Sequence, residues 1–288
     1  MSTVEQKVFP GAEFVSRVLD AADSKETMTK RVTRVFLMRA GMAGMLAGLF
    51  YLANFAVIAA FAQASSNLVG VGRLLGAITF GFALSFIYYT GSELLTSNMM
   101  VTTIAVYFRR MKVGRAAWIL LLCFLGNAAG GLLVAILVHF STLMNGATGE
   151  FVADAVDTKL GYITGGAAGI GDLFVRAILC NFMINLAMLL IYNGRVKSDG
   201  VKVVSMVVAV MVFAFLGFEH SVANTVLFLI KGLSGGIDIW LALANVGVVL
   251  VGNFVGGGLM IGLYYAYLND SDRLLRSSAA TGEVSETN

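Results

Sequence analysis

The residues best suited to chemistry are Glu219 and His220, which are adjacent and are the only ionisable side chains in the apolar run 203–230. An imidazole can donate or accept a proton near neutral pH, and a carboxyl group can pair with a cation or accept hydrogen bonds. Low-dielectric surroundings disfavour the charged imidazole, so we expect His220 to be neutral at rest and able to donate or accept a proton. A neutral histidine that only bridges two helices is the alternative.

The motif that contains this pair has a second copy earlier in the chain. GSELLTSN at 91–98 and GFEHSVAN at 217–224 share the pattern G-x-E-x-x-x-x-N and lie 126 residues apart. GNAAGGLL at 126–133 and GNFVGGGL at 252–259 are separated by the same 126 residues. Two matches at one offset predict an internal duplication. Glu93 is the counterpart of Glu219, but Leu94 is the counterpart of His220, so the predicted centre is asymmetric.

The glycine and glutamate of each copy indicate a break in a helix. Gly91 and Gly217 allow the chain to leave helical geometry without proline, which occurs only at position 10. A break exposes backbone N–H groups, and we expect Glu93 and Glu219 to accept hydrogen bonds from them. This structural role is favoured over direct handling of a substrate, because a bare carboxylate would repel a negatively charged one.

The elements that must hold these motifs are membrane helices. The chain is 58% hydrophobic and 13% charged, which is too little charge for the surface of a soluble domain of 288 residues. Six apolar runs are long enough to cross a hydrocarbon core of about 30 Å. They are 40–72, 74–108, 116–149, 177–194, 203–230 and 239–269. We therefore predict an all-α integral membrane protein with six transmembrane helices in each protomer.

The duplication predicts how the spans are arranged. Repeat one, at about 36–142, and repeat two, at about 170–270, hold three spans each, so the two copies must cross the membrane in opposite senses. The run 74–108 would make a helix of about 50 Å, so a break near 91–97 is needed to fit the membrane. Non-helical backbone at this depth is tolerated only where protein buries it or where it lines a cavity. The two interrupted helices therefore predict a pore or transport site.

The distribution of charge predicts the orientation. Most Lys and Arg residues lie before residue 40, between the second and third runs, after the fourth run or in the tail. By the positive-inside rule, both termini are expected in the cytoplasm, with the chain in the cell membrane. Residues 1–35 form a predicted cytoplasmic amphipathic segment, 36–272 the six-span pore domain and 273–288 a disordered tail. A solvated polar tail with a short helix is the alternative for the first segment.

Four segments together resemble a known family. GSELLTS, LCNFMINLA at 179–187, GFEHSVAN and GNFVGGGLMIGLYY at 252–265 are similar to the signature segments of the formate/nitrite transporter family. The resemblance runs from about residue 10 to about residue 270. It implies a homopentamer of aquaporin-like protomers in the lipid bilayer, each with its own pore. It also implies small monovalent anions as substrates: formate, nitrite or hydrosulfide, with acetate or lactate in some members.

The resemblance also implies roles for individual residues. The family's central histidine corresponds to His220, the loop threonine that faces it to Thr96, and the pore asparagine to Asn181. The outer-vestibule lysine corresponds to Lys159, although the interval to Asn181 is several residues longer here. Asn224, in the histidine motif, is a further candidate pore residue. The constrictions correspond to Phe80 and Phe213 toward the outside and to Leu84, Leu94 and Leu95 toward the cytoplasm.

Simpler roles are open for several of these residues. Thr96 could cap the helix that follows the break, and Asn181 could join two helices. Lys159 could be a solvated loop cation. The phenylalanine and leucine side chains assigned to the constrictions cannot be distinguished from core packing by their pattern, since the chain contains 20 phenylalanines.

The mechanism must overcome the cost of dehydrating an anion in an apolar constriction, which is many kcal/mol. We expect Lys159 and loop dipoles to draw the anion into a vestibule, where the falling dielectric raises the pKa of its conjugate acid. The anion would then cross neutral, or with a proton shared through His220 and Thr96. Formate is the default substrate, and no residue distinguishes it from nitrite or hydrosulfide.

Other functions fit the residues less well. A neutral-solute channel of the aquaporin type would carry Asn-Pro-Ala motifs, which the sequence lacks. An ammonia channel would place paired histidines at mid-membrane, where only one is expected. An enzyme would need a nucleophile or a metal-binding cluster beside Glu219 and His220. We therefore predict a non-enzyme without cofactor or metal, whose partners are anions and protons and not nucleic acid.

Overall fold

The computed structural model describes residues 8, 9, 11–271, 273 and 274, and these residues form helices and no strands, which confirms the all-α prediction. The first half contains α2 (Ala12–Arg31), α3 (Thr33–Ala64), the short η1 (Ser66–Leu68), α4 (Val69–Tyr89), α5 (Leu95–Tyr107) and α6 (Val113–His139). The second half contains α7 (Ala147–Thr164), α8 (Gly166–Tyr192), α9 (Asp199–Phe215), α10 (Ser221–Gly235), α11 (Ile239–Asn253), the π-helical η2 (Phe254–Leu263) and α12 (Tyr264–Leu268).

Five helices of the described chain are long and apolar enough to cross a membrane. They are α3, the segment Ser66–Tyr89 that contains α4, the helices α6 and α8, and the segment Ile239–Leu268 that contains α11. The shorter helices α9 and α10 flank a break within the run 203–230, and α4 and α5 flank a break within the run 74–108. If each interrupted pair is counted as one crossing, the helices agree with the six predicted spans.

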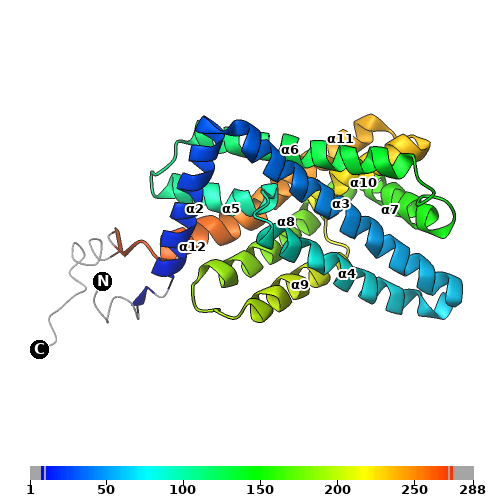
Figure 1. The fold of residues 1–288 in the computed structure, drawn as a ribbon, viewed down its shortest axis with the longest axis horizontal. Helices are drawn as coiled ribbons and strands as arrows, with labels where there is room; N and C mark the ends of the chain where they lie inside the picture. Colours follow the sequence, from blue (N-terminus) through cyan, green and yellow to red (C-terminus); the bar gives the residue numbers. More distant parts are fainter. Residues whose placement is uncertain (1–7, 10, 272, 275–288) are drawn as a thin grey trace, which may run out of the picture.

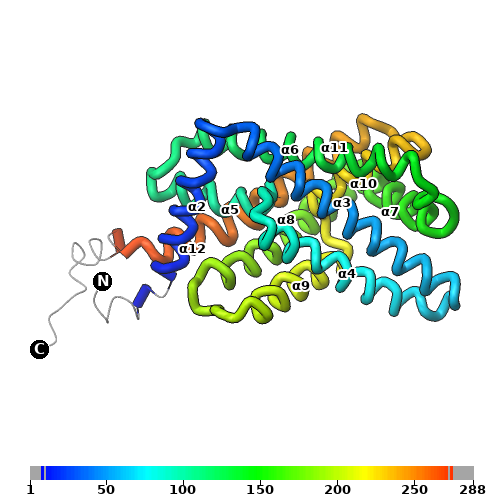
Figure 2. Tube along the Cα trace, viewed as in Figure 1, coloured from blue at the N-terminus to red at the C-terminus, as the bar shows by residue number. Residues whose placement is uncertain are grey.

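The described part of the chain begins and ends at the same end of the molecule. Figures 1 and 2 show α2 beside α12 at this end and α7 at the opposite end. The Gly11 N–H donates to Asn269 Oδ1 at 2.8 Å, which ties the start of α2 to the cap of α12. The breaks between α4 and α5 and between α9 and α10 lie near the middle of the molecule (Figure 2). We call the two ends the α2 end and the α7 end.

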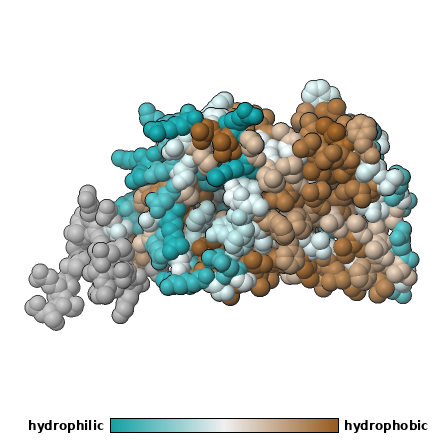
Figure 3. Space-filling model, viewed as in Figure 1, coloured by the Kyte–Doolittle hydropathy of each residue, from teal (hydrophilic) through white to brown (hydrophobic). Residues whose placement is uncertain are grey.

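The surface has the polarity expected of a membrane protein. Figure 3 shows hydrophilic residues gathered at the α2 end and hydrophobic residues over most of the face beyond it. Large apolar side chains such as Leu137, Leu243 and Val251 are more than half exposed, which in water would be costly over so wide an area. These side chains would contact lipid.

The N-terminal helix is amphipathic and packs onto the helical core. α2 buries Phe14, Val15 and Val18 and leaves Glu13 and Arg17 exposed. It ends at Arg31, and α3 begins at Thr33, slightly before the predicted boundary at residue 36. Most of the predicted tail, 273–288, lies outside the described residues, and so do residues 1–7 of the predicted N-terminal segment.

Candidate functional site

Both helix breaks occur at the glycines of the repeated motif. Gly91 has φ 63° and Gly217 has φ 68°, in the left-handed region that favours glycine. The chain then becomes extended, and Leu94 and His220 are the N-cap residues of α5 and α10. The counterpart residues Leu94 and His220 therefore occupy equivalent positions in the two repeats.

Two buried asparagines hold the backbone of the breaks. Asn127 Oδ1 accepts the Leu95 N–H at 3.0 Å, and Asn253 Oδ1 accepts the Ser221 N–H at 2.9 Å. The amide nitrogen of each asparagine donates to the carbonyl of the motif glutamate, at 2.8 Å for Asn127 and 2.9 Å for Asn253. An amide offers both a donor and an acceptor, so one side chain satisfies two backbone groups of the break.

The two glutamates have a different role from the predicted one. The Glu93 carboxylate accepts hydrogen bonds from Lys25 Nζ at 2.5 Å and Asn98 Nδ2 at 3.0 Å, and not from the backbone of the break. The Glu219 carboxylate likewise accepts from Lys159 Nζ at 2.7 Å and Asn224 Nδ2 at 2.6 Å. Each glutamate therefore forms a buried ion pair with a lysine and does not cap the backbone as predicted. A cation offsets the cost of burying a carboxylate charge better than a further neutral donor does.

The imidazole of His220 is held between the two repeats. Its Nδ1 accepts the Ala223 N–H at 3.1 Å, so the neutral ring carries its proton on Nε2. Nε2 lies 3.1 Å from Thr96 Oγ1, which belongs to the first repeat. The Phe213 ring stacks on the imidazole with 6.0 Å between centroids. The Nε2–H is therefore a single donor directed at the junction of the repeats.

Three cavities follow one another through the protomer. A cavity of about 340 Å³ at the α7 end, the α7 cavity, is lined by Tyr51, Lys159, Phe80, Phe213 and His220, among others. A central cavity of about 20 Å³ shares Phe80, Phe213 and His220 with it. A cavity of about 190 Å³ at the α2 end, the α2 cavity, is lined by Lys25 and Glu93 and shares Leu84 and Leu94 with the central one. The shared residues place the three spaces in series.

The central cavity is narrow and apolar except for the imidazole. Phe80 and Phe213 meet edge to face with centroids 5.9 Å apart between the α7 cavity and the central cavity. Leu84 and Leu94 line both the central cavity and the α2 cavity. The central volume holds about one water molecule. Leu95 is buried and lines none of the three cavities.

Asn181 does not lie on the cavities. Its side chain is fully buried, and its amide nitrogen donates to the Thr96 carbonyl at 3.1 Å and to the Asn253 carbonyl at 2.7 Å. Asn185 Nδ2, one turn later, donates to the same Thr96 carbonyl at 3.1 Å. The helix-joining alternative therefore describes Asn181 better than pore lining does, because its donors are already used within the protein.

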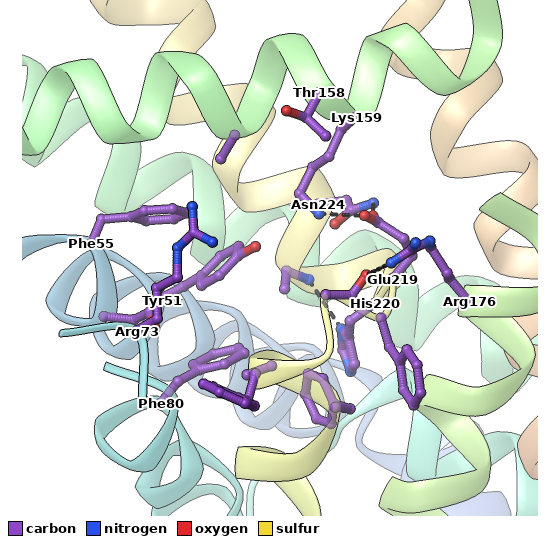
Figure 4. A pocket seen from close by; sticks show the side chains of 18 of the residues that line it. Tyr51, Phe55, Arg73, Phe80, Thr158, Lys159, Arg176, Glu219, His220 and Asn224 are labelled. Carbon is purple, nitrogen blue, oxygen red and sulfur yellow. Dashed lines mark hydrogen bonds and ion pairs between the residues drawn. The ribbon is translucent and has the colours of Figure 1, made fainter. Parts of the chain in front are cut away.

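Lys159, the predicted vestibule lysine, lines the α7 cavity, but its charge is not free. Figure 4 shows its side chain directed at Glu219 and Asn224 on the wall of the α7 cavity. Burial by itself lowers the pKa of the Lys159 ammonium, but the Glu219 carboxylate more than offsets this and raises that pKa above its ordinary value. Asn224 also lines the α7 cavity, and its amide nitrogen donates to both Glu219 and Asn245.

Several residues of the site were missed in the sequence. Asn127 and Asn253 stand in the repeated GN motif, so the 126-residue offset could have drawn attention to them. Tyr51 lines the α7 cavity and stacks on Phe80 with centroids 4.7 Å apart, but no motif contains it. The repeat does not indicate Lys25 either, because the separation of Lys25 and Lys159 in the sequence differs from the repeat offset of 126 residues.

Comparisons with known proteins agree with this architecture. The family model of the formate/nitrite transporters matches residues 12–267. The formate channel FocA of Escherichia coli (strain K12) is 30% identical over 229 residues, which cover 70% of this chain and 77% of FocA. The nitrite transporter NirC of Salmonella typhimurium (strain LT2) is 29% identical over 240 residues, 81% of this chain and 82% of NirC. The solved structure of an FNT family ion channel superposes on this chain with a TM-score of 0.77 at 25% sequence identity. The match covers 88% of this chain and 98% of the ion channel. The chain belongs to the formate/nitrite transporter family.

Proposed function

We propose that this protein passes small monovalent weak-acid anions across the cell membrane, with formate as the principal substrate and one pore in each protomer of a homopentamer. The observation that carries the proposal is the position of His220. Among the residues that the structure describes, its imidazole is the one titratable group that lines the central cavity, which lies between the Phe80–Phe213 and Leu84–Leu94 constrictions. The similarity to a formate channel supports the same substrate.

The proposed mechanism uses the Nε2–H of His220. In the resting state the Thr96 hydroxyl lies 3.1 Å from Nε2 and serves as its acceptor. An anion that enters from either large cavity replaces this hydroxyl as acceptor, so the proton lies between the imidazole and the anion. A charge shared in this way is cheaper to place in the 20 Å³ central cavity than a bare anion. The substrate then crosses each constriction as a neutral acid or with its proton shared.

The proposed orientation places the α2 end in the cytoplasm. This end contains the basic loop between α5 and α6 (Figure 1), with Arg109, Arg110 and Lys112, and the positive-inside rule favours it on the cytoplasmic side. Both described ends of the chain would then be cytoplasmic.

Nitrite is the second candidate substrate. A nitrite transporter is 29% identical to this chain, and nitrite is also a small planar weak-acid anion. Hydrosulfide would fit the central cavity by size but has one acceptor atom in place of two oxygens.

The experiment is formate uptake into proteoliposomes at pH 6. We expect His220→Phe to abolish uptake, because a flat aromatic ring is kept while the only side-chain donor that the described residues bring to the central cavity is lost. His139→Phe is the matched control, since His139 is exposed at the end of α6 and should be replaceable without effect. Native mass spectrometry should give pentamers for both variants. Undiminished uptake by pentameric His220→Phe protein would contradict proton sharing.

Competition in the same vesicles identifies the anion. Unlabelled formate, nitrite and hydrosulfide are added in turn to labelled formate, with urea as a neutral control. Formate as the strongest competitor supports the proposal, and stronger competition by nitrite or hydrosulfide would reassign the principal substrate.

A further inference from the structure

We propose that Arg73 captures anions at the α7 cavity, and that its guanidinium selects planar anions with two oxygens. The inference rests on the proposed function as an anion channel and adds to it the residue that first binds the substrate. It also moves the role expected of Lys159 to another element, because Arg73 belongs to α4 and not to α7.

The charges on the wall of the α7 cavity are unevenly compensated. The described part of the chain contributes three cations to the lining, Arg73, Lys159 and Arg176, and a single carboxylate, Glu219. The Lys159 ammonium is paired with Glu219 at 2.7 Å. Arg176 Nε is paired with Asp172 at 2.8 Å, and Arg176 Nη1 donates to the carbonyls of Leu216 and Gly217.

Arg73 is the exception among these cations. Within the part of the chain that the structure describes, its guanidinium has no ion pair and no hydrogen-bond partner. The acidic residues Asp154 and Asp157 of α7 are exposed and do not belong to the lining of the cavity. Arg73 therefore supplies the uncompensated positive charge of the α7 cavity, and an anion that enters is attracted to it first.

The position of Arg73 suits capture before the constriction. Figure 4 shows the guanidinium beside the rings of Tyr51 and Phe55, away from the Lys159–Glu219–Asn224 group. Arg73 and Phe80 are seven residues apart on α4, so they share a helix face, with Arg73 about 10 Å farther toward the α7 end. An anion held at Arg73 is thus about two helical turns from the Phe80–Phe213 constriction.

The chemistry of the guanidinium defines the class of ligand. Its planar fork binds the two oxygens of a carboxylate with two parallel hydrogen bonds. Formate and nitrite both present two oxygens in a plane, whereas hydrosulfide presents one sulfur. Arg73 should therefore favour formate and nitrite over hydrosulfide, and a lysine at this position should attract all three without this preference.

The first test is concentration-dependent uptake in proteoliposomes. We expect Arg73→Gln to raise the half-saturating formate concentration about tenfold while the maximal rate stays within about twofold, because capture is lost and the central cavity is intact. Arg73→Lys should restore most of the affinity but reduce the preference for formate over hydrosulfide. Arg109→Gln, at an exposed arginine in the loop after α5, is the matched control and should behave as wild type.

The second test does not depend on transport. Thr158 is exposed on the wall of the α7 cavity, and the native thiols of Cys123 and Cys180 are fully buried. A cysteine introduced by Thr158→Cys is reacted in detergent with an anionic and with a cationic methanethiosulfonate reagent. Adding Arg73→Gln should lower the ratio of the anionic to the cationic rate by at least about threefold.

The two tests separate this inference from the proposed function. An unchanged ratio of reagent rates overturns the role of Arg73, whatever the protein transports. If the ratio falls but the wild type takes up no formate, the proposed substrate fails while anion capture by Arg73 stands. A lowered ratio together with a raised half-saturating concentration supports both.

Discussion

Removing the Lys159 ammonium should destabilise the protein more than it weakens anion binding. The Lys159 Nζ and Glu219 Oε2 atoms are 2.7 Å apart, and the two side chains are 8% and 4% exposed. Lys159→Met keeps the length of the apolar stem but leaves a buried carboxylate whose remaining donor is the neutral amide of Asn224. Breaking a buried ion pair by removing one partner typically costs about 3–5 kcal/mol.

The loss should be visible as thermal destabilisation of the purified protein. For a chain of this size, about 1 kcal/mol corresponds to roughly 2–4 °C in Tm, so we expect Lys159→Met to lower Tm by about 10 °C. The double variant Lys159→Met with Glu219→Gln removes both charges, and its Gln oxygen can still accept from Asn224. It should therefore recover most of the lost stability.

The double variant also separates structure from function. If Lys159 acts through its pair with Glu219, formate uptake by the double variant should recover together with Tm. A Lys159→Met protein with unchanged Tm but a raised half-saturating formate concentration would refute this reasoning, because it would show that the ammonium serves the substrate and not Glu219.

Two further predictions concern the frame around the site. Gly257→Ala should lower Tm by several degrees and reduce uptake, because the added Cβ would overlap the amide nitrogens of Asn181 and Asn185. Gly247→Ala is the control and should leave Tm and uptake unchanged, because the space around its Cβ is open. The pKa of the Lys25 ammonium is lowered by burial but raised more strongly by the Glu93 carboxylate, so it lies above its ordinary value. The stability that this pair contributes is present below the ordinary lysine pKa and is lost only as the pH rises through the raised one. The Tm difference between wild type and Lys25→Met should therefore stay constant from pH 7 to pH 9, and a difference that shrinks within this range would contradict the assignment.

Repetition within the chain explains why much of the site was predictable. The offset of 126 residues identified Glu93 as the counterpart of Glu219 in the other repeat and showed that His220 has no histidine counterpart. The glycines of the motif predicted both breaks, since no other residue adopts positive φ so readily. Apolar runs predicted the helices because a membrane requires about 20 apolar residues for each crossing.

The errors come from contacts between distant parts of the chain. Asn181 was expected on the pore, but the close approach of η2 at Gly257 places it among the backbone carbonyls of the breaks. Both glutamates were expected to cap the backbone, yet asparagines 34 residues further along fill that role. A pattern of residue types shows that a polar group is buried, but it does not show which partner reaches it.

Local sequence thus determined the helices, their breaks and the single histidine of the repeated motif, because each depends on residues that are neighbours in the chain. The tertiary structure alone decided which charges are neutralised. Lys25 and Glu93 are 68 residues apart, and Lys159 and Glu219 are 60 apart, so these pairs form only when whole helices pack. The same packing leaves Arg73, on the wall of the α7 cavity, without a partner among the described residues. Coulomb interactions depend on distance in space, and for this chain the fold sets that distance.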